Sequence, residues 1–350
     1  MRHLRWGVIG AGGIAFRRTI PEGILPASNS QLVAIMDQNG DLARTVAHTF
    51  GVPRSYDCEE KLLNDPEVEA VYIATPLFLH ARQIAAAAER GKHILCEKPL
   101  AMTSAECYEV SAICRRAGVK LGVGLMMRFH GAHRRVKALL DQGALGSIVS
   151  ARAQLTCWYP PIAGAWRQRR ETGGGGALID MGIHCVDLLR WFLGEVAQVA
   201  ALITTQTHAY EVEDSATLLL KFKNGAHGVV EAFFNIPDAG SVNALELYGT
   251  QGAILGRGTI GQSSGGELSA YLPKDNPPEY DSLQARSYRE DIIPLHYEPV
   301  NTYRAEIEQF AEWVLHGSGE VVPAEEAARD LAVLEAGYQA GRGGRMIMLP

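Results

Sequence analysis

The chain has 350 residues, of which 47% are hydrophobic and 21% charged, and its formal net charge is -6. This composition is typical of a globular protein, and the length suffices for roughly two domains of about 150 residues each. The negative charge argues against a nucleic-acid partner, because phosphate binding needs a basic surface, and no apolar run reaches the about 18 residues of a membrane span.

The N-terminus MRHLRWGVIGAGG resembles a signal peptide in its basic residues, short apolar run and small residues. We interpret it instead as a first strand that enters a glycine turn. The cysteines form no CxxC pair and have no metal-ligand spacing, which predicts reduced, packed thiols, a cytoplasmic location and no metal site. They are Cys58, Cys96, Cys107, Cys114, Cys157 and Cys185.

Strands and helices alternate along the first 125 residues. Apolar strands are expected at 4–12, 31–37, 68–76, 92–99 and 119–127. Helical patterns follow at 41–51, 79–91 and 104–118, and Thr103 with Glu106 predicts a capping box for the last of them. Continuous apolar strands separated by helices predict an α/β domain with a parallel, doubly wound sheet covered on both faces.

After about residue 145 the strands follow one another without helices between them, which predicts an α+β domain with a large, mostly antiparallel sheet. They are expected at 147–156, 197–207, 216–235 and 241–256. Asn224-Gly225 predicts a hairpin inside the third. One clear helix follows the four glycines at 173–176, loops are expected at 257–290, and helices at 302–317 and 323–341 close the chain.

The first turn reads Gly10-Ala-Gly12-Gly13-Ile14-Ala15, a GxGxxA pattern between a strand and a helix. Gly10 allows a tight turn, Gly12 lets the backbone approach a pyrophosphate, and the helix N-terminus favours anions. Asp37 ends the second strand, where a carboxylate can accept hydrogen bonds from ribose hydroxyls. No Lys or Arg occupies 38–40 to bind a 2′-phosphate, so the pattern favours NAD over NADP. The alternative is a tight turn with a solvated Asp37.

Asp180, His184, Asp187 and Trp191 recur at spacings that place them on one face of a helix. We expect this stripe to face a cleft or solvent, with the four glycines letting the backbone pass close to a ligand. The alternative is a solvated face with a supporting Asp–His pair. Lys98 follows the fourth parallel strand, at the edge of the sheet where ligands bind in such folds, and the alternative there is a surface lysine in a turn.

Four motifs together resemble the Gfo/Idh/MocA family, named for glucose–fructose oxidoreductase and inositol dehydrogenase. They are Gly10–Ala15, Thr75-Pro76 with His80, Glu97-Lys98-Pro99, and Trp166-Arg167 ahead of GGGGALIDMGIHCVDLLRWFLG. The resemblance covers nearly the whole chain. It implies an NAD(P)-dependent oxidoreductase that acts on a CH–OH group of a sugar, sugar derivative or cyclitol, and that forms homodimers or homotetramers.

The resemblance also implies a domain division. Residues 1–125 would form a Rossmann domain that binds NAD, and residues 126–350 an open-faced domain for substrate binding and oligomerisation. The closing helices at 302–341 can then pack back on the first domain. One departure is Met126-Met127, where many members carry Asn and Arg; this removes polar contacts near the expected pocket and leaves the substrate undefined.

The resemblance implies Lys98, Asp180 and His184 as the catalytic residues. The residues expected to bind the cofactor are Gly10, Gly12, Gly13, Ile14, Asp37, Thr75, Pro76, His80, Glu97 and Lys98. Those expected to bind the substrate are Lys98, Arg128, Trp158, Tyr159, Trp166, Arg167, Asp180 and His184. The three aromatic side chains suit stacking on a sugar ring, and the alternative is that they only pack the loop.

The chemistry of these side chains suggests their roles. An imidazole titrates near working pH, so His184 is the candidate general base, and Asp180 would orient its ring. Lys98 would stabilise the developing alkoxide. Three other readings remain open: a redox-neutral enzyme that uses NAD to cleave glycosides, a regulator that binds NAD(H) without turnover, and a metal enzyme with Asp180 and His184 as ligands. No third metal ligand is found at a suitable spacing.

Overall fold

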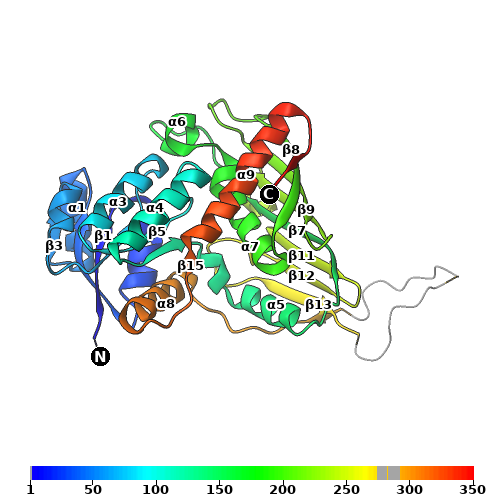
Figure 1. Cartoon of the computed structure of the whole chain (residues 1–350), viewed down its shortest axis with the longest axis horizontal. Coiled ribbons are helices and arrows are strands. Elements are labelled where there is room, and N and C mark those ends of the chain that lie inside the picture. Colours follow the sequence, from blue (N-terminus) through cyan, green and yellow to red (C-terminus); the bar gives the residue numbers. More distant parts are fainter. Residues whose placement is uncertain (1, 274–281, 283–291) are drawn as a thin grey trace. The chain divides into compact units, whose positions relative to one another are not determined.

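The computed structural model describes residues 2–273, 282 and 292–350, and the chain divides into two units. Unit 1 comprises Met1–Met126, Arg169–Gly174 and Asn301–Ala332. Unit 2 comprises Met127–Gln168, Gly175–Val300 and Val333–Pro350. Each unit is built on one sheet (Figure 1).

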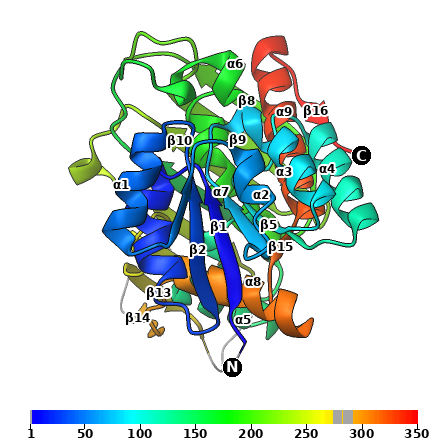
Figure 2. The ribbon, with the colours of Figure 1, turned by 90° about the vertical axis from the view of Figure 1, so that its left-hand side faces the viewer.

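The sheet of unit 1 has the strand order β15-β6-β5-β4-β1-β2-β3, and all neighbours are parallel except the edge strand β15. Its strands are β1 (Leu4–Ile9), β2 (Ser30–Met36), β3 (Arg54–Tyr56), β4 (Ala70–Ile73), β5 (His93–Glu97), β6 (Leu121–Gly124) and β15 (Val322–Pro323). Figure 2 shows β1 and β2 side by side. The predicted parallel sheet is therefore confirmed, with β3 and β15 as strands that the sequence analysis did not predict.

Helices precede or follow most strands of unit 1. They are η1 (Ala15–Ile24), α1 (Gly40–Phe50), α2 (Glu59–Leu63), η2 (Leu77–Leu79), α3 (His80–Glu89), α4 (Ser104–Ala117), α6 (Arg170–Gly173) and α8 (Thr302–His316). The capping box predicted at Thr103 and Glu106 is present at the start of α4. The helix after the glycine turn, η1, is a π-helix with Pro21 inside it.

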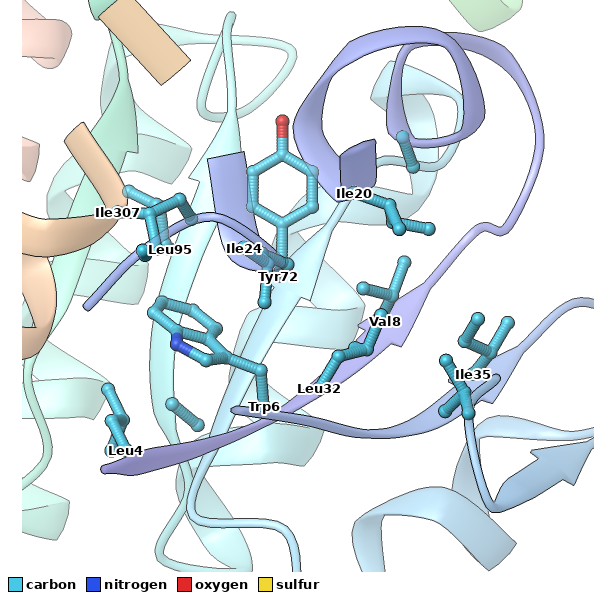
Figure 3. Packing of buried hydrophobic residues seen from close by; sticks show 14 of the residues in the cluster. Leu4, Trp6, Val8, Ile20, Ile24, Leu32, Ile35, Tyr72, Leu95 and Ile307 are labelled. Carbon is cyan, nitrogen blue, oxygen red and sulfur yellow. The ribbon is translucent and has the colours of Figure 1, made fainter. Parts of the chain in front are cut away.

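The core of unit 1 surrounds β1, whose side chains alternate between the two faces of the sheet. Trp6 and Val8 point to the face on which η1 and α8 lie (Figure 3). The rings of Trp6 and Phe310 are 5.2 Å apart between centroids. Gly7 points the other way, where a Cβ would come 2.9 Å from Leu62 of α2. Helices thus cover both faces, as the apolar strands predict.

The sheet of unit 2 has the strand order β14-β13-β12-β11-β7-β10-β9-β8-β16, and every neighbouring pair is antiparallel except β7 with β10. Its strands are β7 (Ile148–Thr156), β8 (Val196–Thr204), β9 (Ser215–Phe222), β10 (His227–Phe233), β11 (Ala244–Gly249), β12 (Ala253–Arg257), β13 (Glu267–Tyr271), β14 (Ile293–Pro294) and β16 (Ile347–Met348). The hairpin predicted at Asn224-Gly225 joins β9 to β10.

The expectation of loops throughout 257–290 is wrong at β13, which adds a strand to the sheet. Along β13 the buried side chains of Leu268 and Ala270 alternate with more exposed neighbours. The part of that loop at 274–281 and 283–290 lies outside the described residues. Among the residues that the structure does describe, none of the helices combines the length and apolar character needed to cross a bilayer.

The remaining helices are η3 (Met126–Phe129), α5 (Gly131–Asp141), η4 (Trp166–Gln168), η5 (Leu178–Gly182), α7 (Ile183–Leu193), η6 (Asp238–Gly240) and α9 (Ala324–Gly343). One face of the unit 2 sheet is buried, with Leu218 and Leu220 of β9 in the core. On the other face Leu219 is 57% exposed and Leu202 of β8 is 76% exposed. The expected antiparallel sheet is therefore present and leaves large apolar side chains uncovered.

Candidate active site

The glycine turn after β1 is shaped by close backbone approach in unit 1. Gly10 has φ +93°, and a Cβ there would come 2.9 Å from the carbonyl carbon and oxygen of Ala74. Gly13 has φ +53°, and a Cβ on it would meet no described atom within 4 Å. Glycine is thus required at 10 by the adjoining strand end, while the backbone at Gly13 is open on the side of its missing side chain. Gly12 and Ile14 are half-buried in the same turn.

Asp37 lies beside this turn because β2 is the neighbour of β1. Its Oδ2 accepts a hydrogen bond from the Ala11 N–H at 3.0 Å, and its Oδ1 accepts one from the Asn39 N–H at 2.9 Å. Asn39 in turn caps α1 with its side chain. The carboxylate is therefore fixed at the carboxyl end of β2 next to the glycine turn.

The ends of β4 and β5 are joined by a buried imidazole. His80 Nδ1 lies 2.9 Å from the Pro99 carbonyl oxygen, and its Nε2 lies 3.0 Å from the Thr75 carbonyl oxygen. His80 thus bridges the segment Thr75-Pro76 and the segment Glu97-Lys98-Pro99, and its direct contact with a cofactor stays a prediction.

A buried tyrosine fixes the carboxylate that precedes Lys98. Tyr72 of β4 donates a short hydrogen bond to Glu97 and accepts one from Thr19 at 2.9 Å. Burial, and next the charge of Glu97, raise the pKa of Tyr72 well above its ordinary value, so it remains a donor. Glu97 Oε2 accepts the Lys98 N–H at 3.2 Å. The backbone of half-buried Lys98 is therefore anchored from the core of the sheet.

Sequence reasoning missed Thr19 and Tyr72. The one available signal was the phenol of Tyr72 between the apolar residues Val71 and Ile73, since a buried phenol needs a hydrogen-bond partner.

In unit 2, Asp180 and His184 fall on the two sides of a change in helix type. Asp180 lies in the π-helical turn η5 and His184 in the first turn of α7. Short π-helical segments inside helices are frequent at functional sites. Asp180 Oδ1 accepts a hydrogen bond from Arg167 Nε at 3.1 Å, and the Arg167 guanidinium stacks 4.2 Å from the Trp166 ring centroid. The structure thus brings together three of the predicted substrate residues.

The polar stripe is buried further along α7. Asp187 is 1% exposed, and its Oδ1 accepts hydrogen bonds from Arg128 Nη2 at 2.5 Å and Nε at 2.8 Å. The guanidinium also lies 5.7 Å from the Trp191 ring centroid. The expectation that the stripe faces a cleft or solvent is therefore wrong at Asp187, because Arg128 from η3 covers it. A contact of Arg128 with substrate stays a prediction.

The two adjacent aromatic residues of the predicted substrate set differ in exposure. Trp158 is 45% exposed and packs edge-on against His208 with centroids 4.9 Å apart. His208 stacks on Tyr210 in turn. Tyr159 packs against Phe234 with centroids 5.0 Å apart. Trp158 is thus supported from behind and offers a free ring surface, whereas Tyr159 contributes to packing. The sequence did not indicate His208 and Tyr210 as supports of the aromatic residues, because they lie in an irregular segment between two strands.

Lys98 belongs to unit 1, and Asp180 and His184 belong to unit 2. That the three act together on one substrate stays a prediction. Within the described ranges, no group of three or more His, Cys, Asp or Glu side chains could hold a metal ion.

Two family models match most of the chain. A model described as "Oxidoreductase family, NAD-binding Rossmann fold" matches residues 4–125, and the model for the "GFO/IDH/MocA C-terminal domain" matches residues 133–255. A 1,5-anhydro-D-fructose reductase of Ensifer adhaerens is 33% identical over 80% of this chain and 86% of its own. A D-xylose 1-dehydrogenase (NADP(+)) of Haloferax volcanii is 30% identical over 99% of this chain and 100% of its own.

A solved structure, a levoglucosan dehydrogenase in complex with NADH and levoglucosan, aligns with the whole of both chains at a TM-score of 0.85 and 25% identity.

Proposed function

Because the chain belongs to the GFO/IDH/MocA family of oxidoreductases, we propose that it oxidises a secondary alcohol of a sugar, sugar derivative or cyclitol with NAD as hydride acceptor. The observation that carries the proposal is the arrangement of one sheet edge. The glycine turn, Asp37 and the Glu97-Lys98 pair all lie at the carboxyl ends of parallel strands of this sheet, which is where dinucleotides bind in such sheets.

The residues of unit 1 fit the NAD that the family uses. The open side of Gly13 leaves space next to the backbone, and Asp37 presents a fixed carboxylate for ribose hydroxyls. The same carboxylate would repel a 2′-phosphate, which favours NAD over NADP. When bound, NAD supplies an acceptor for the hydride that leaves the alcohol carbon.

The chain's own side chains then manage the proton and the oxygen. In this proposal His184 accepts the hydroxyl proton at a ring nitrogen, and Lys98 donates to the oxygen as negative charge develops on it. Asp180 supports the charged imidazole. The hydrogen bond from Arg167 ties the Asp180 carboxylate to the segment that carries Trp166 and Arg167.

For substrate recognition we propose stacking on Trp158 and hydrogen bonding by Arg167. A sugar ring has apolar C–H faces that suit an aromatic surface, and the exposed face of Trp158 is held in place by His208. Arg167 is held by Trp166 and Asp180 within reach of solvent. The relatives that act on 1,5-anhydro-D-fructose and D-xylose support a sugar substrate.

We also propose that the open face of the unit 2 sheet joins copies of the chain into a homodimer or homotetramer. Leu219 pairs across the sheet with Val229, and Leu202 lies on the next strand toward the edge. Exposed apolar side chains of this size on a regular surface are typical of interaction sites. Arg152 on the same face forms ion pairs with Glu231 and Glu246, so these charges are paired within one chain.

NADH formation across a panel of inositols, aldoses, anhydrosugars, sugar acids and glycosides tests the activity. Lys98→Ala and His184→Ala should each lower turnover by about 10²–10⁴-fold, because each removes a group that acts on the reacting oxygen or its proton. NAD affinity should be nearly unchanged in His184→Ala, because His184 is not among the residues expected to bind the cofactor. Lys61→Ala is a matched control. This exposed lysine of unit 1 forms an i,i+4 ion pair with Asp57, its one ion pair among the described residues.

Wild-type turnover in either variant would remove that residue from the mechanism. No NADH from any compound, with free sugar released from glycosides, would favour redox-neutral cleavage instead. Neither product, with NAD still bound, would favour a regulator.

A further inference from the structure

Two of the four glycines before the helix that carries His184 pack tightly against other parts of the protein. Gly174 has φ +73° and ends α6, whereas Gly175 and Gly176 pass directly against two residues of unit 2. A Cβ on Gly176 would overlap the Glu213 carbonyl oxygen, and a Cβ on Gly175 would overlap the Tyr338 hydroxyl. Glycine is therefore needed at 175 and 176 for close approach to the protein itself.

Glu213 receives three hydrogen bonds on one oxygen. Its Oε1 accepts from the Gly176 N–H at 2.9 Å, the Leu178 N–H at 3.1 Å and the Tyr338 hydroxyl at 2.7 Å. Its carbonyl oxygen accepts a fourth, from the Ala177 N–H at 3.0 Å. The side chain is 7% exposed. Three converging donors match an ionised carboxylate, and they oppose the burial that raises the pKa of Glu213.

These contacts supply hydrogen-bond acceptors to backbone N–H groups at the N-terminus of the helix formed by η5 and α7. The first N–H groups of a helix lack intrahelical acceptors, and a negative charge there is favourable. Here Glu213 supplies that acceptor and that charge to Gly176 and Leu178. Asp180 follows at once, since its N–H already donates to the Gly176 carbonyl at 3.0 Å. The position of the Asp180 turn is thus tied to Glu213.

Tyr338 reaches Glu213 from α9 because that helix packs closely on unit 2. A Cβ on its neighbour Gly337 would come 2.8 Å from Leu218 of β9 and 3.6 Å from Leu178 of η5. The missing side chain lets α9 approach both elements, which brings the phenol to the carboxylate. A residue near the C-terminus therefore helps to hold the helix start that bears Asp180.

We propose that Glu213 and Tyr338 are positioning residues that hold the turn carrying Asp180 and His184 in its working geometry. The proposal rests on the catalytic role proposed above for those two side chains. Misplacement of a reacting group by about 1 Å can cost about 10²-fold in rate, so small displacements at this turn matter. Glu213 and Tyr338 themselves touch neither substrate nor cofactor in this proposal.

Tyr338→Phe removes one hydroxyl, and Glu213→Gln replaces the ionised acceptor. Both should lower kcat by about 10- to 100-fold while KM for NAD stays near the wild-type value. Hydrogen–deuterium exchange should rise in peptides that cover 174–184, because the acceptor of the Gly176 and Leu178 amides becomes a weaker, neutral oxygen in Glu213→Gln and loses the support of its phenol in Tyr338→Phe. Hydrogen–deuterium exchange needs no substrate and measures the protection of the backbone amides in this turn directly. Tyr56→Phe is the matched control, since it also removes a tyrosine-to-carboxylate hydrogen bond, 3.0 Å long, to Asp65 of unit 1.

Unchanged exchange at 174–184 in both variants would overturn the proposal, and so would raised exchange with wild-type kcat. His184→Ala in the same series separates the two levels of inference. Wild-type turnover in that variant means that the catalytic assignment has failed. Loss of turnover there, with normal turnover in Tyr338→Phe, overturns the positioning role alone. Tyr338→Phe keeps the test decisive if Glu213→Gln does not fold.

Discussion

His133 of α5 is a buried imidazole with no exposed surface, and its Nδ1 lies 2.8 Å from the Met127 carbonyl oxygen. Burial, and then the neighbouring His130, lower the pKa of His133 to about 3. The residue is thus neutral in the folded protein at pH values where the unfolded chain, with a pKa of about 6.5, takes up a proton. Native stability therefore depends on pH through this side chain.

The folded pKa lies below the unfolded one, so the stabilising contribution is complete above about pH 6.5 and is lost as the pH falls toward 3. The loss is at most about 1.4 kcal/mol per pH unit. In His133→Asn, whose side chain does not titrate, the free energy of unfolding should fall less steeply between pH 6.5 and 4. Urea unfolding across that range measures the slope. The exposed His316→Asn is the control, and equal slopes in His133→Asn and wild type would contradict the prediction.

Single residues of the candidate site were predictable only where a local motif names them. Lys98 lies in Glu-Lys-Pro, and Asp180 and His184 lie behind a run of glycines. Glu213 and Tyr338 stand 125 residues apart, so no spacing pattern could join them. Asp187 was read as part of an exposed stripe because its partner Arg128 is 59 residues away along the chain.

Elements with strong periodicity or clear caps were predicted well, and short or weakly apolar ones were not. The strand β3 has three half-buried residues and therefore no contrast between faces. The helix α5 buries Ala132, His133, Val136 and Leu139, a helical spacing in which two of the four side chains are small or polar. The helix after the glycines was expected, but its π-helical first turn was not, because the extra residue per turn leaves no mark in sequence.

Gly176→Ala tests the packing at the start of that helix. The added methyl group would overlap the Glu213 carbonyl oxygen, and since this neighbour is backbone it cannot move aside cheaply. We expect the free energy of unfolding to fall by about 1–3 kcal/mol. Gly240→Ala of η6 has no described atom within 4 Å of the added Cβ and should change stability by less than about 0.5 kcal/mol. Denaturant unfolding of both variants measures the two changes in the free energy of unfolding. A Gly176 variant as stable as the Gly240 variant would mean that the segment is free to adjust.

At the scale of the whole chain, the sequence predicted a parallel and a mostly antiparallel sheet, and both are present. It allowed the closing helices at 302–341 to pack back on the first domain, and residues 301–332 lie in unit 1, but it could not predict that β15 pairs with β6 across about half the chain. The functions assigned to the two domains stay predictions: cofactor binding for residues 1–125, and substrate binding with oligomerisation for residues 126–350.

The exposed sheet face of unit 2 predicts the assembly state. Light scattering after gel filtration should give a mass that is a multiple of the 38.0 kDa chain. The double substitution Leu202→Glu with Leu219→Glu should reduce it to a single chain, because two buried charges would face each other across the interface. Leu25→Glu, a similarly exposed leucine of unit 1, should leave the mass unchanged. A wild-type mass of one chain would contradict the proposed self-association.

The strands β15 and β16 lie late in the chain, and this affects folding during synthesis. Val322–Pro323 add the edge strand of one sheet and Ile347–Met348 that of the other. The sheet of unit 1 therefore lacks its last strand until residue 323 has been made, and the sheet of unit 2 lacks its last strand until residue 348 has been made. During synthesis the edge of β6 remains open until β15 has been translated, about 200 residues later, and unpaired strand edges attract wrong partners. Nascent chains of this protein should accordingly depend on chaperones for longer than the early completion of β1 to β6 would suggest.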